Sequence, residues 1–152
     1  MRVDYQQEFL FQVKGECESL IELHWEEIAL NKEIIKLNPD WDAYEELEAA
    51  GRLSIFTARA MGELVGYFVV IVGTNLHYKD HLFAANDILF LRKDYRKGFC
   101  GAKLITFAEK SLAEDGVSIL TINTKIHQPF DRLLERLGFK NIERVYSKVL
   151  GA

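Results

Sequence analysis

Residues 95–104 read YRKGFCGAKL, a basic stretch with two glycines. An apolar run, residues 88–91, precedes this stretch, and a segment with helical periodicity follows it. The order predicts a strand, a short turn and a helix. Backbone N–H groups at the start of a helix have no internal partners, and they lie at the positive end of the helix dipole. Because glycine lets a backbone approach a phosphate closely, the stretch predicts an anion-binding turn.

Composition indicates one ordinary globular domain over residues 1–152. Of these residues 49% are hydrophobic and 28% are charged, a balance typical of soluble proteins, and the length suffices to bury a core. The net charge of −4 argues against nucleic-acid binding through bulk charge. Cys17 and Cys100 lack metal-ligand spacing and are too few for a disulfide framework, so we expect no metal. With no signal-type apolar core and no membrane-length apolar run, we expect a cytoplasmic protein.

The first third of the chain predicts one strand and two helices. A short strand is expected within residues 1–9. Residues 16–30 carry apolar side chains at helical spacing, with His24 on the apolar stripe. A second helix is expected to begin at Asp42, since Asp42 and Glu45 have the spacing of a capping box, and to end at Gly51.

The middle of the chain predicts a hairpin. Residues 53–60 and 64–72 have strand composition, and residues 61–63 form a turn signal between them. The second strand is nearly all apolar, so we expect it to be buried on both faces. Residues 73–81 read as a polar loop, and residues 82–91 return to strand character.

Asn86 and Asp87 interrupt that last strand. Polar groups in a buried strand are costly unless they are paired, so these two residues require an explanation.

The remainder predicts further alternation of helices and strands. A helix after the glycine turn buries one face and ends at Asp115 and Gly116; a strand over residues 117–123 follows. Residues 130–137 predict a short helix ended by Gly138, and residues 139–150 a last strand or hairpin. The order is mixed α/β without the strict alternation of a doubly wound sheet.

Three kinds of phosphate-binding turn compete for residues 95–104. A Walker loop requires G-x-x-x-x-G-K-[ST], but Gly98 and Gly101 are only three residues apart and Lys103 precedes a leucine. A Rossmann turn requires a third glycine and an acidic residue after the next strand, where this chain has Asn123, Thr124 and Lys125. The Walker interpretation fails and the Rossmann interpretation is weak.

The stretch resembles motif A of the GCN5-related N-acetyltransferase (GNAT) superfamily, Q/R-x-x-G-x-G/A between a strand and a helix. Arg96 matches its first position and Gly101 its last, whereas Phe99 stands where the middle glycine is expected and Gly98 is shifted by one. Residues 137–139, LGF, resemble the family's later glycine corner, and residues 146–150 resemble its last strand. Many relatives use a tyrosine as general acid four residues before that glycine; this chain has Leu134.

Four further segments make the chain similar to a GNAT subgroup common in bacteriophage genomes. They are residues 24–27 (HWEE), 75–78 (NLHY), 86–87 (ND) and 95–96 (YR). With these segments the resemblance covers nearly the whole chain.

The resemblance implies a GNAT-like mixed α/β fold, with a mostly antiparallel central sheet flanked by helices. It also implies an N-acetyltransferase that moves an acetyl group from acetyl-CoA to a primary amine. The coenzyme A pyrophosphate would lie on the backbone of the turn, and the pantetheine arm along a splayed strand edge. The expected cofactor-binding residues are Leu89, Leu91, Arg96, Lys97, Gly98, Phe99, Cys100, Gly101 and Ala102.

The acceptor side of the expected site centres on Asp87. An ammonium must lose a proton before it attacks, so a general base is useful, and Asp87 aligns with the strand that carries the family's glutamate base. The simpler alternative is that Asp87 caps a bulge or loop. His77 and Tyr146 are the other catalytic candidates. The simpler alternatives are that His77 is a solvent-exposed loop residue and that Tyr146 packs within a strand.

The expected substrate pocket adds four residues, although an apolar-stripe histidine is more often a core residue. They are His24, Glu27, Tyr78 and Asn86.

The sequence leaves the identity of the acceptor open: a small amine, a protein lysine or N-terminus, or an amine on a modified nucleotide. The oligomeric state is left open as well; a homodimer is one candidate, since dimers are common among relatives. The rival hypothesis is a non-catalytic module that binds acyl-CoA or a partner protein, and Leu134 together with the irregular motif keeps it open.

Overall fold

A computed structural model describes residues 2–151 and shows one central sheet between two layers of helices. The sheet has five strands in the order β1-β2-β3-β4-β5, and only the β4–β5 pair is parallel. The strands are β1 Val3–Glu8, β2 Leu53–Ala60, β3 Glu63–Asn75, β4 Tyr78–Leu91 and β5 Val117–Thr121. The expected mixed, mostly antiparallel α/β fold is confirmed.

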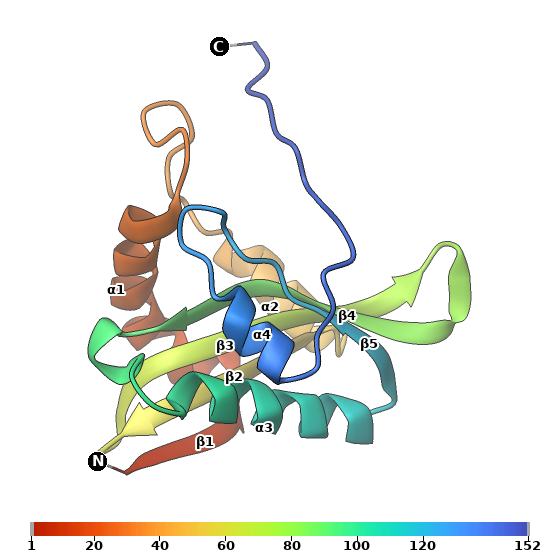
Figure 1. Ribbon diagram of the computed structural model, residues 1–152, viewed down its shortest axis with the longest axis horizontal. Coiled ribbons are helices and arrows are strands. Elements are labelled where there is room, and N and C mark those ends of the chain that lie inside the picture. Colours follow the sequence, from red (N-terminus) through yellow and green to blue (C-terminus); the bar gives the residue numbers. More distant parts are fainter. Residues whose placement is uncertain (1, 152) are drawn as a thin grey trace.

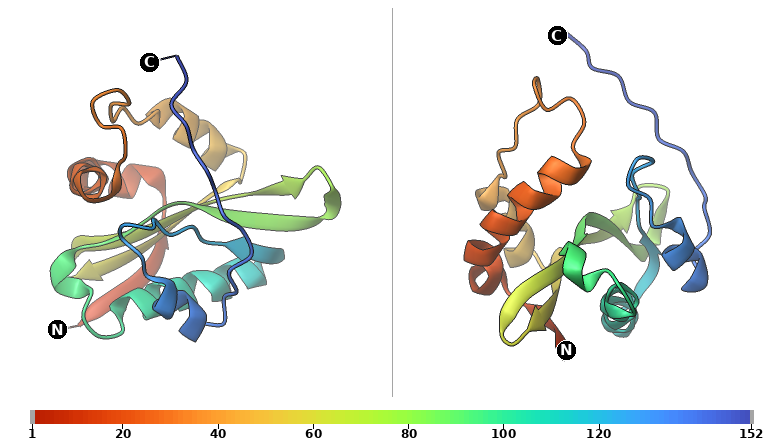
Figure 2. Two further views of the ribbon diagram at one scale, coloured as in Figure 1. Left: turned by 45° about the horizontal axis from the view of Figure 1, so that its top comes forward. Right: turned by 60° about the vertical axis from the view of Figure 1, so that its left-hand side comes forward.

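Helices α1 (Leu10–Ile28) and α2 (Trp41–Ala49) cover one face of the sheet; α3 (Cys100–Glu114) and α4 (Asp131–Arg136) cover the other (Figure 2). Each face therefore has its own apolar core. Tyr67 and Phe68, adjacent on β3, belong to opposite cores, and both are almost fully buried. The prediction that this strand is buried on both faces is confirmed.

Both early helices begin before their predicted starts. Helix α1 starts at Leu10 because the apolar stripe continues through Leu10 and Val13, and because the Gln12 side chain accepts a hydrogen bond from the Phe9 N–H (2.7 Å). Helix α2 is capped by Asp40, whose carboxylate accepts from the Ala43 N–H (3.0 Å). The predicted cap at Asp42 is wrong, since Asp42 lies inside the first turn.

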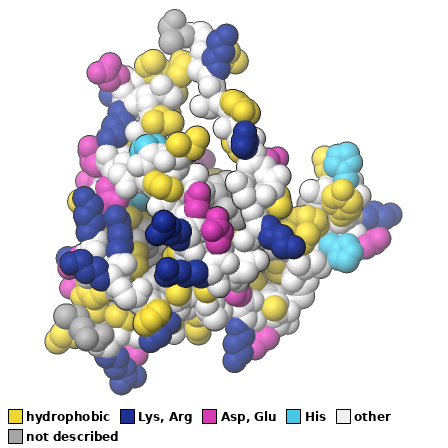
Figure 3. All heavy atoms as spheres, in the orientation of Figure 1, with side chains coloured by type: hydrophobic (Ala, Val, Ile, Leu, Met, Phe, Trp, Pro, Cys, Tyr) yellow, Lys and Arg dark blue, Asp and Glu magenta, His cyan; other side chains and the backbone are white. Residues whose placement is uncertain are grey.

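The expected loop over residues 73–81 is wrong. Strands β3 and β4 stay paired as far as Asn75 and Tyr78, so the segment forms the tip of a long hairpin that projects from the body (Figure 1). Polar side chains there face solvent on both sides of a ladder, which made the sequence resemble a loop. Figure 3 shows histidine side chains on this projecting hairpin.

The last strand or hairpin, expected over residues 139–150, is also wrong. These residues form no helix and no strand, and they run away from the body as an extended segment (Figure 1). Its apolar side chains, including Ile142 and Val145, are largely exposed. The strand-like composition of the segment therefore has no partner within the described part of the chain. Among residues 2–151, no helix combines the length and the apolar character that crossing a bilayer would require.

Candidate functional site

A β-bulge places Asp87 at the surface of the sheet. Val69 pairs with Ile88 and the next residue, Val70, pairs with Asn86, so Asp87 is the extra residue of β4. Such bulges bend a strand and redirect a side chain. Asp87 is exposed and Asn86 is half-buried, so the expectation of two polar groups in a buried strand is wrong.

At the same point β4 separates from β5. Their ladder ends at Ala85 and Thr121, and no described strand pairs with the β5-facing edge of β4 beyond it. The Asn86 side chain bridges the opening by accepting a hydrogen bond from the Asn123 N–H (2.8 Å). Leu89 and Leu91 lie on the part of β4 that has separated from β5.

Strand β4 leads through a short 3-10 helix, Lys93–Tyr95, into the glycine turn. Gly98 has φ +83°, a conformation that disfavours any other residue. Phe99 is the N-cap of α3 but provides no side-chain cap, and the first bond of the helix runs from the Lys103 N–H to the Phe99 carbonyl (2.9 Å). The N–H groups of residues 100–102 therefore lack an intrahelical acceptor and can bind an anion.

Figure 3 shows Lys and Arg side chains gathered on the face around this turn. Arg96, which follows the 3-10 helix, is engaged within the protein. Its Nε donates to the Leu91 carbonyl (2.6 Å), its Nη2 donates to both oxygens of Glu27 (2.8 and 3.1 Å), and its guanidinium lies over the Phe90 ring. Arg96 therefore ties the turn to α1, whereas the neighbouring Lys97 is exposed.

His24 is a core histidine, as the simpler alternative held. Its ring packs against Phe90 (5.1 Å between centroids) and is only 8% exposed. Burial is the main cause that lowers its pKa to about 4, so His24 is neutral near pH 7. Glu27 pairs with Arg96 and makes no hydrogen bond to His24, and neither residue lines a cavity described here.

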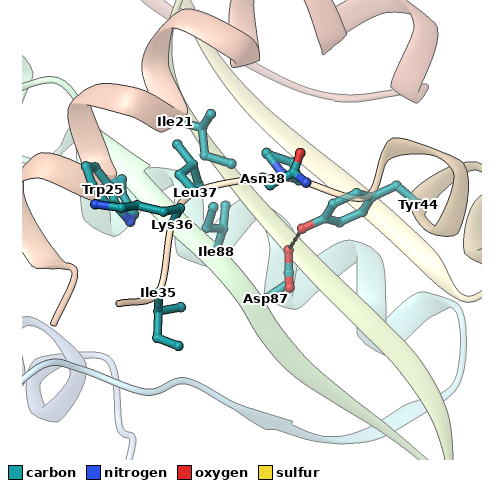
Figure 4. Close-up of a pocket in the computed structure, with 10 residues that line it drawn as sticks. Ile21, Trp25, Ile35, Lys36, Leu37, Asn38, Tyr44, Asp87 and Ile88 are labelled. Atoms are coloured by element: carbon teal, nitrogen blue, oxygen red, sulfur yellow. Dashed lines mark hydrogen bonds between the residues drawn. The ribbon is translucent and has the colours of Figure 1, made fainter. Parts of the chain in front are cut away.

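A cavity of about 300 Å³ opens between α1, the segment before α2, and the bulge of β4 (Figure 4). Asp87 forms part of its wall, and Tyr44, from α2, donates a hydrogen bond to the Asp87 carboxylate. Burial and the contact with Asp87 both raise the pKa of Tyr44, so the phenol keeps its proton. The lining residues are Ile21, Trp25, Ile35, Lys36, Leu37, Asn38, Pro39, Tyr44, Asp87 and Ile88.

The other two catalytic candidates, His77 and Tyr146, do not line the cavity with Asp87. His77 lies in the tight turn of the β3–β4 hairpin, ten residues along from Asp87, and a strand rises about 3.3 Å per residue. The expectation that His77 and Asp87 share a pocket is wrong because the hairpin is extended; Tyr78, at the start of β4, is 60% exposed. Tyr146 is 87% exposed on the extended C-terminal segment, whereas Leu134 is buried in α4.

Sequence reasoning missed Tyr44 and most of the cavity wall. Tyr44 lies in the middle of a short helix, and its contact with Asp87 spans 43 residues of sequence. No local spacing signals such a pair. The sequence indicated one residue of this wall indirectly: Trp25 follows His24 in the HWEE segment.

No protein-family model and no curated protein sequence matches the chain. Solved structures do match over almost the full length. An aminoglycoside acetyltransferase from an uncultured soil metagenomic sample has a TM-score of 0.76 at 18% identity, covering 99% of this chain and 100% of its own. A ribosomal-protein-alanine N-acetyltransferase from Brucella melitensis biovar Abortus 2308 has a TM-score of 0.72 at 21% identity, covering 99% and 100%.

A third match is AAC(6′)-Iy in complex with the bisubstrate analogue CoA-S-monomethyl-acetylneamine. Its TM-score is 0.70 at 17% identity, and the match covers both chains completely. At these identities the likeness establishes architecture and leaves the reaction to be argued from the site. The chain shares the fold of these solved acetyltransferase structures.

Proposed function

We propose that the protein is an N-acetyltransferase that uses acetyl-CoA and a primary amine. The observation that carries the proposal is the position of Asp87. It lies on a bulge at the point where β4 separates from β5, and it also lines the 300 Å³ cavity. A carboxylate is thus placed between an open strand edge, which suits an extended cofactor arm, and a cavity that suits an acceptor.

The residues of the turn fit coenzyme A. The free N–H groups of residues 100–102 and the positive end of the α3 dipole favour a pyrophosphate, and exposed Lys97 adds charge. Charge-assisted hydrogen bonds contribute about 1.5–3 kcal/mol each. Arg96 supports this site indirectly, by fixing the turn against α1 through Glu27.

The open edge of β4 fits the pantetheine arm. Extended chains add to exposed strand edges through backbone hydrogen bonds, and residues 86–91 offer such an edge beside the turn. We place the contacts at Leu89 and Leu91, with a strand N–H polarising the thioester carbonyl. Bound acetyl-CoA supplies the activated acetyl group.

Asp87 acts as the general base. The acceptor enters as an ammonium, pairs with the carboxylate, and transfers its proton to Asp87 directly or through one water. Tyr44 holds the carboxylate in place by hydrogen bonding. The freed amine nitrogen attacks the thioester carbonyl carbon and forms the new C–N bond, and the C–S bond breaks. The nitrogen gives up its second proton to water, and water protonates the departing thiolate, because Leu134 has no proton to donate and Tyr146 is 87% exposed on the C-terminal segment.

The test is thiol release from acetyl-CoA in the presence of a panel of primary amines. Amine-dependent release that disappears in Asp87→Asn supports the enzyme. Binding of acetyl-CoA with no release over the whole panel supports instead a module that binds acyl-CoA without turnover.

A further inference from the structure

We infer that the acceptor is a primary monoamine carried on an apolar body, and that polyamines and amino sugars are poor ligands. This inference rests on the proposed function and concerns the cavity beside Asp87. Its volume of about 300 Å³ suits a small molecule and excludes a folded macromolecule from the interior. The chemistry of its wall selects the class of small molecule.

The wall is mostly apolar. Ile21 and Trp25 come from α1, and Ile88 comes from β4 beside the bulge (Figure 4). Ile35, Leu37 and Pro39, from the segment before α2, complete the apolar wall. An alkyl or aryl body removes its own surface and these side chains from water, which favours binding roughly in proportion to the area buried. A body covered with hydroxyl groups loses hydration without finding partners here.

The wall offers one carboxylate. Asp87 carries the only negative charge among the lining residues, and Lys36 carries a positive charge. The acidic side chains at the end of α1 already have cationic partners: Glu26 lies 3.5 Å from the Lys32 ammonium, and Glu27 pairs with Arg96. A first ammonium therefore pairs with Asp87, whereas a second one meets Lys36 and has no counter-ion.

The experiment compares hexylamine with 1,6-diaminohexane, which have the same carbon chain and differ by one ammonium. Isothermal titration of the protein, without acetyl-CoA, measures binding independently of turnover. We expect hexylamine to bind at least tenfold more tightly than the diamine, and kanamycin to bind more weakly still. From butylamine to hexylamine, affinity is expected to rise about fourfold per buried methylene.

A charge reversal separates the roles of Lys36 and Asp87. In Lys36→Glu the ratio of the affinity for hexylamine to the affinity for 1,6-diaminohexane is expected to shrink at least fivefold, because the second ammonium of the diamine gains a counter-ion. Lys79→Glu makes the same change of charge on the projecting hairpin, away from the cavity, and is expected to leave the preference unchanged. Trp25→Ala is expected to weaken the binding of phenethylamine more than the binding of butylamine.

Each outcome bears on one of the two proposals. If the diamine or kanamycin binds as tightly as hexylamine, the inference that the acceptor is an apolar monoamine is overturned. The proposed acetyl transfer is unaffected by that result as long as thiol release proceeds. The acceptor class is also overturned if Lys36→Glu leaves the preference unchanged or if no monoamine binds. Tight, monoamine-selective binding without thiol release supports the acceptor class and contradicts the proposed transfer reaction.

Discussion

Tyr44 donates a hydrogen bond to the carboxylate of Asp87 and so links helix α2 to the bulge of strand β4. The contact therefore fixes the carboxylate in the cavity wall and leaves its other oxygen for a substrate. The proposed base is thus positioned by a residue from a different layer of the fold.

Removing the Tyr44 hydroxyl is expected to release the Asp87 carboxylate from its fixed position. In Tyr44→Phe the measured kcat should fall at least about tenfold, because one hydrogen bond to a charged group contributes about 1.5–3 kcal/mol. Tyr78→Phe, on the exposed hairpin, is the control. A Tyr44→Phe variant that keeps the wild-type kcat contradicts the positioning role.

A carboxylate at the start of α3 should abolish cofactor binding. Gly101→Asp places a negative charge beside the proposed pyrophosphate site, and a Cβ at this position meets Leu133 no closer than 3.4 Å, so the fold should persist. The thermal shift caused by acetyl-CoA is expected to disappear.

Ala113→Asp adds the same charge near the other end of α3, at an exposed position, and should keep the shift. An undiminished shift in Gly101→Asp excludes this turn as the cofactor site.

The buried His24 should make stability depend on pH. Its folded pKa of about 4 lies below the usual 6.5, so the unfolded chain binds a proton first as pH falls. Its contribution is complete above pH 6.5 and is lost between pH 6.5 and 4, amounting to about 3 kcal/mol. Urea unfolding at pH 7 and pH 4.5 should show this loss in wild type and a smaller loss in His24→Phe. His77→Gln, on the hairpin, should behave as wild type.

A buried ion-pair network should matter for stability more than any surface pair. Arg59 is paired with Glu8 and Glu16, each at 2.9 Å, and the side chains of Arg59 and Glu8 are 13% and 7% exposed. Arg59→Leu leaves Glu8 buried without its counter-ion and is expected to cost about 3–5 kcal/mol in the free energy of unfolding.

The matched control is Arg2→Leu, which breaks the exposed pair with Asp4 and should cost under about 1 kcal/mol. If Arg59→Leu and Arg2→Leu lower the free energy of unfolding by equal amounts, the network has no special role in stability.

Elements with strong periodicity could be predicted from the sequence. Strand β2 has the predicted bounds, and the predicted face of α3, which includes Leu104 and Ala108, is buried. The pattern of α3 follows from burial on one face, whereas β2 is buried on both faces and is marked by its strand composition and by the turn that follows it. The predictions for residues 73–81 and 139–150 are wrong for opposite reasons. Residues 73–81, predicted as a loop, belong to a pair of strands with both faces in solvent. Residues 139–150, predicted as a strand, have strand composition but no strand to pair with among the described residues.

The strand, the glycine turn and the helix around residues 95–104 could be predicted because they are local in sequence. Gly98, Phe99 and the first turn of α3 lie within a few residues of one another, so their spacing carries the information. The cavity beside Asp87 could not be predicted, because it is assembled from distant segments. Tyr44 and Asp87 come together only through the packing of α2 on the sheet, and the bulge at Asp87 is visible only as a change in strand register.

The role of Asp87 as the base in acetyl transfer is open to one decisive paired measurement on Asp87→Asn. Thiol release is measured with saturating acetyl-CoA and hexylamine, together with the thermal shift that acetyl-CoA produces. We expect an unchanged thermal shift and a loss of kcat of about 10²–10⁴-fold, the usual contribution of a general base. An Asp87→Asn variant that releases thiol at the wild-type rate would contradict this role.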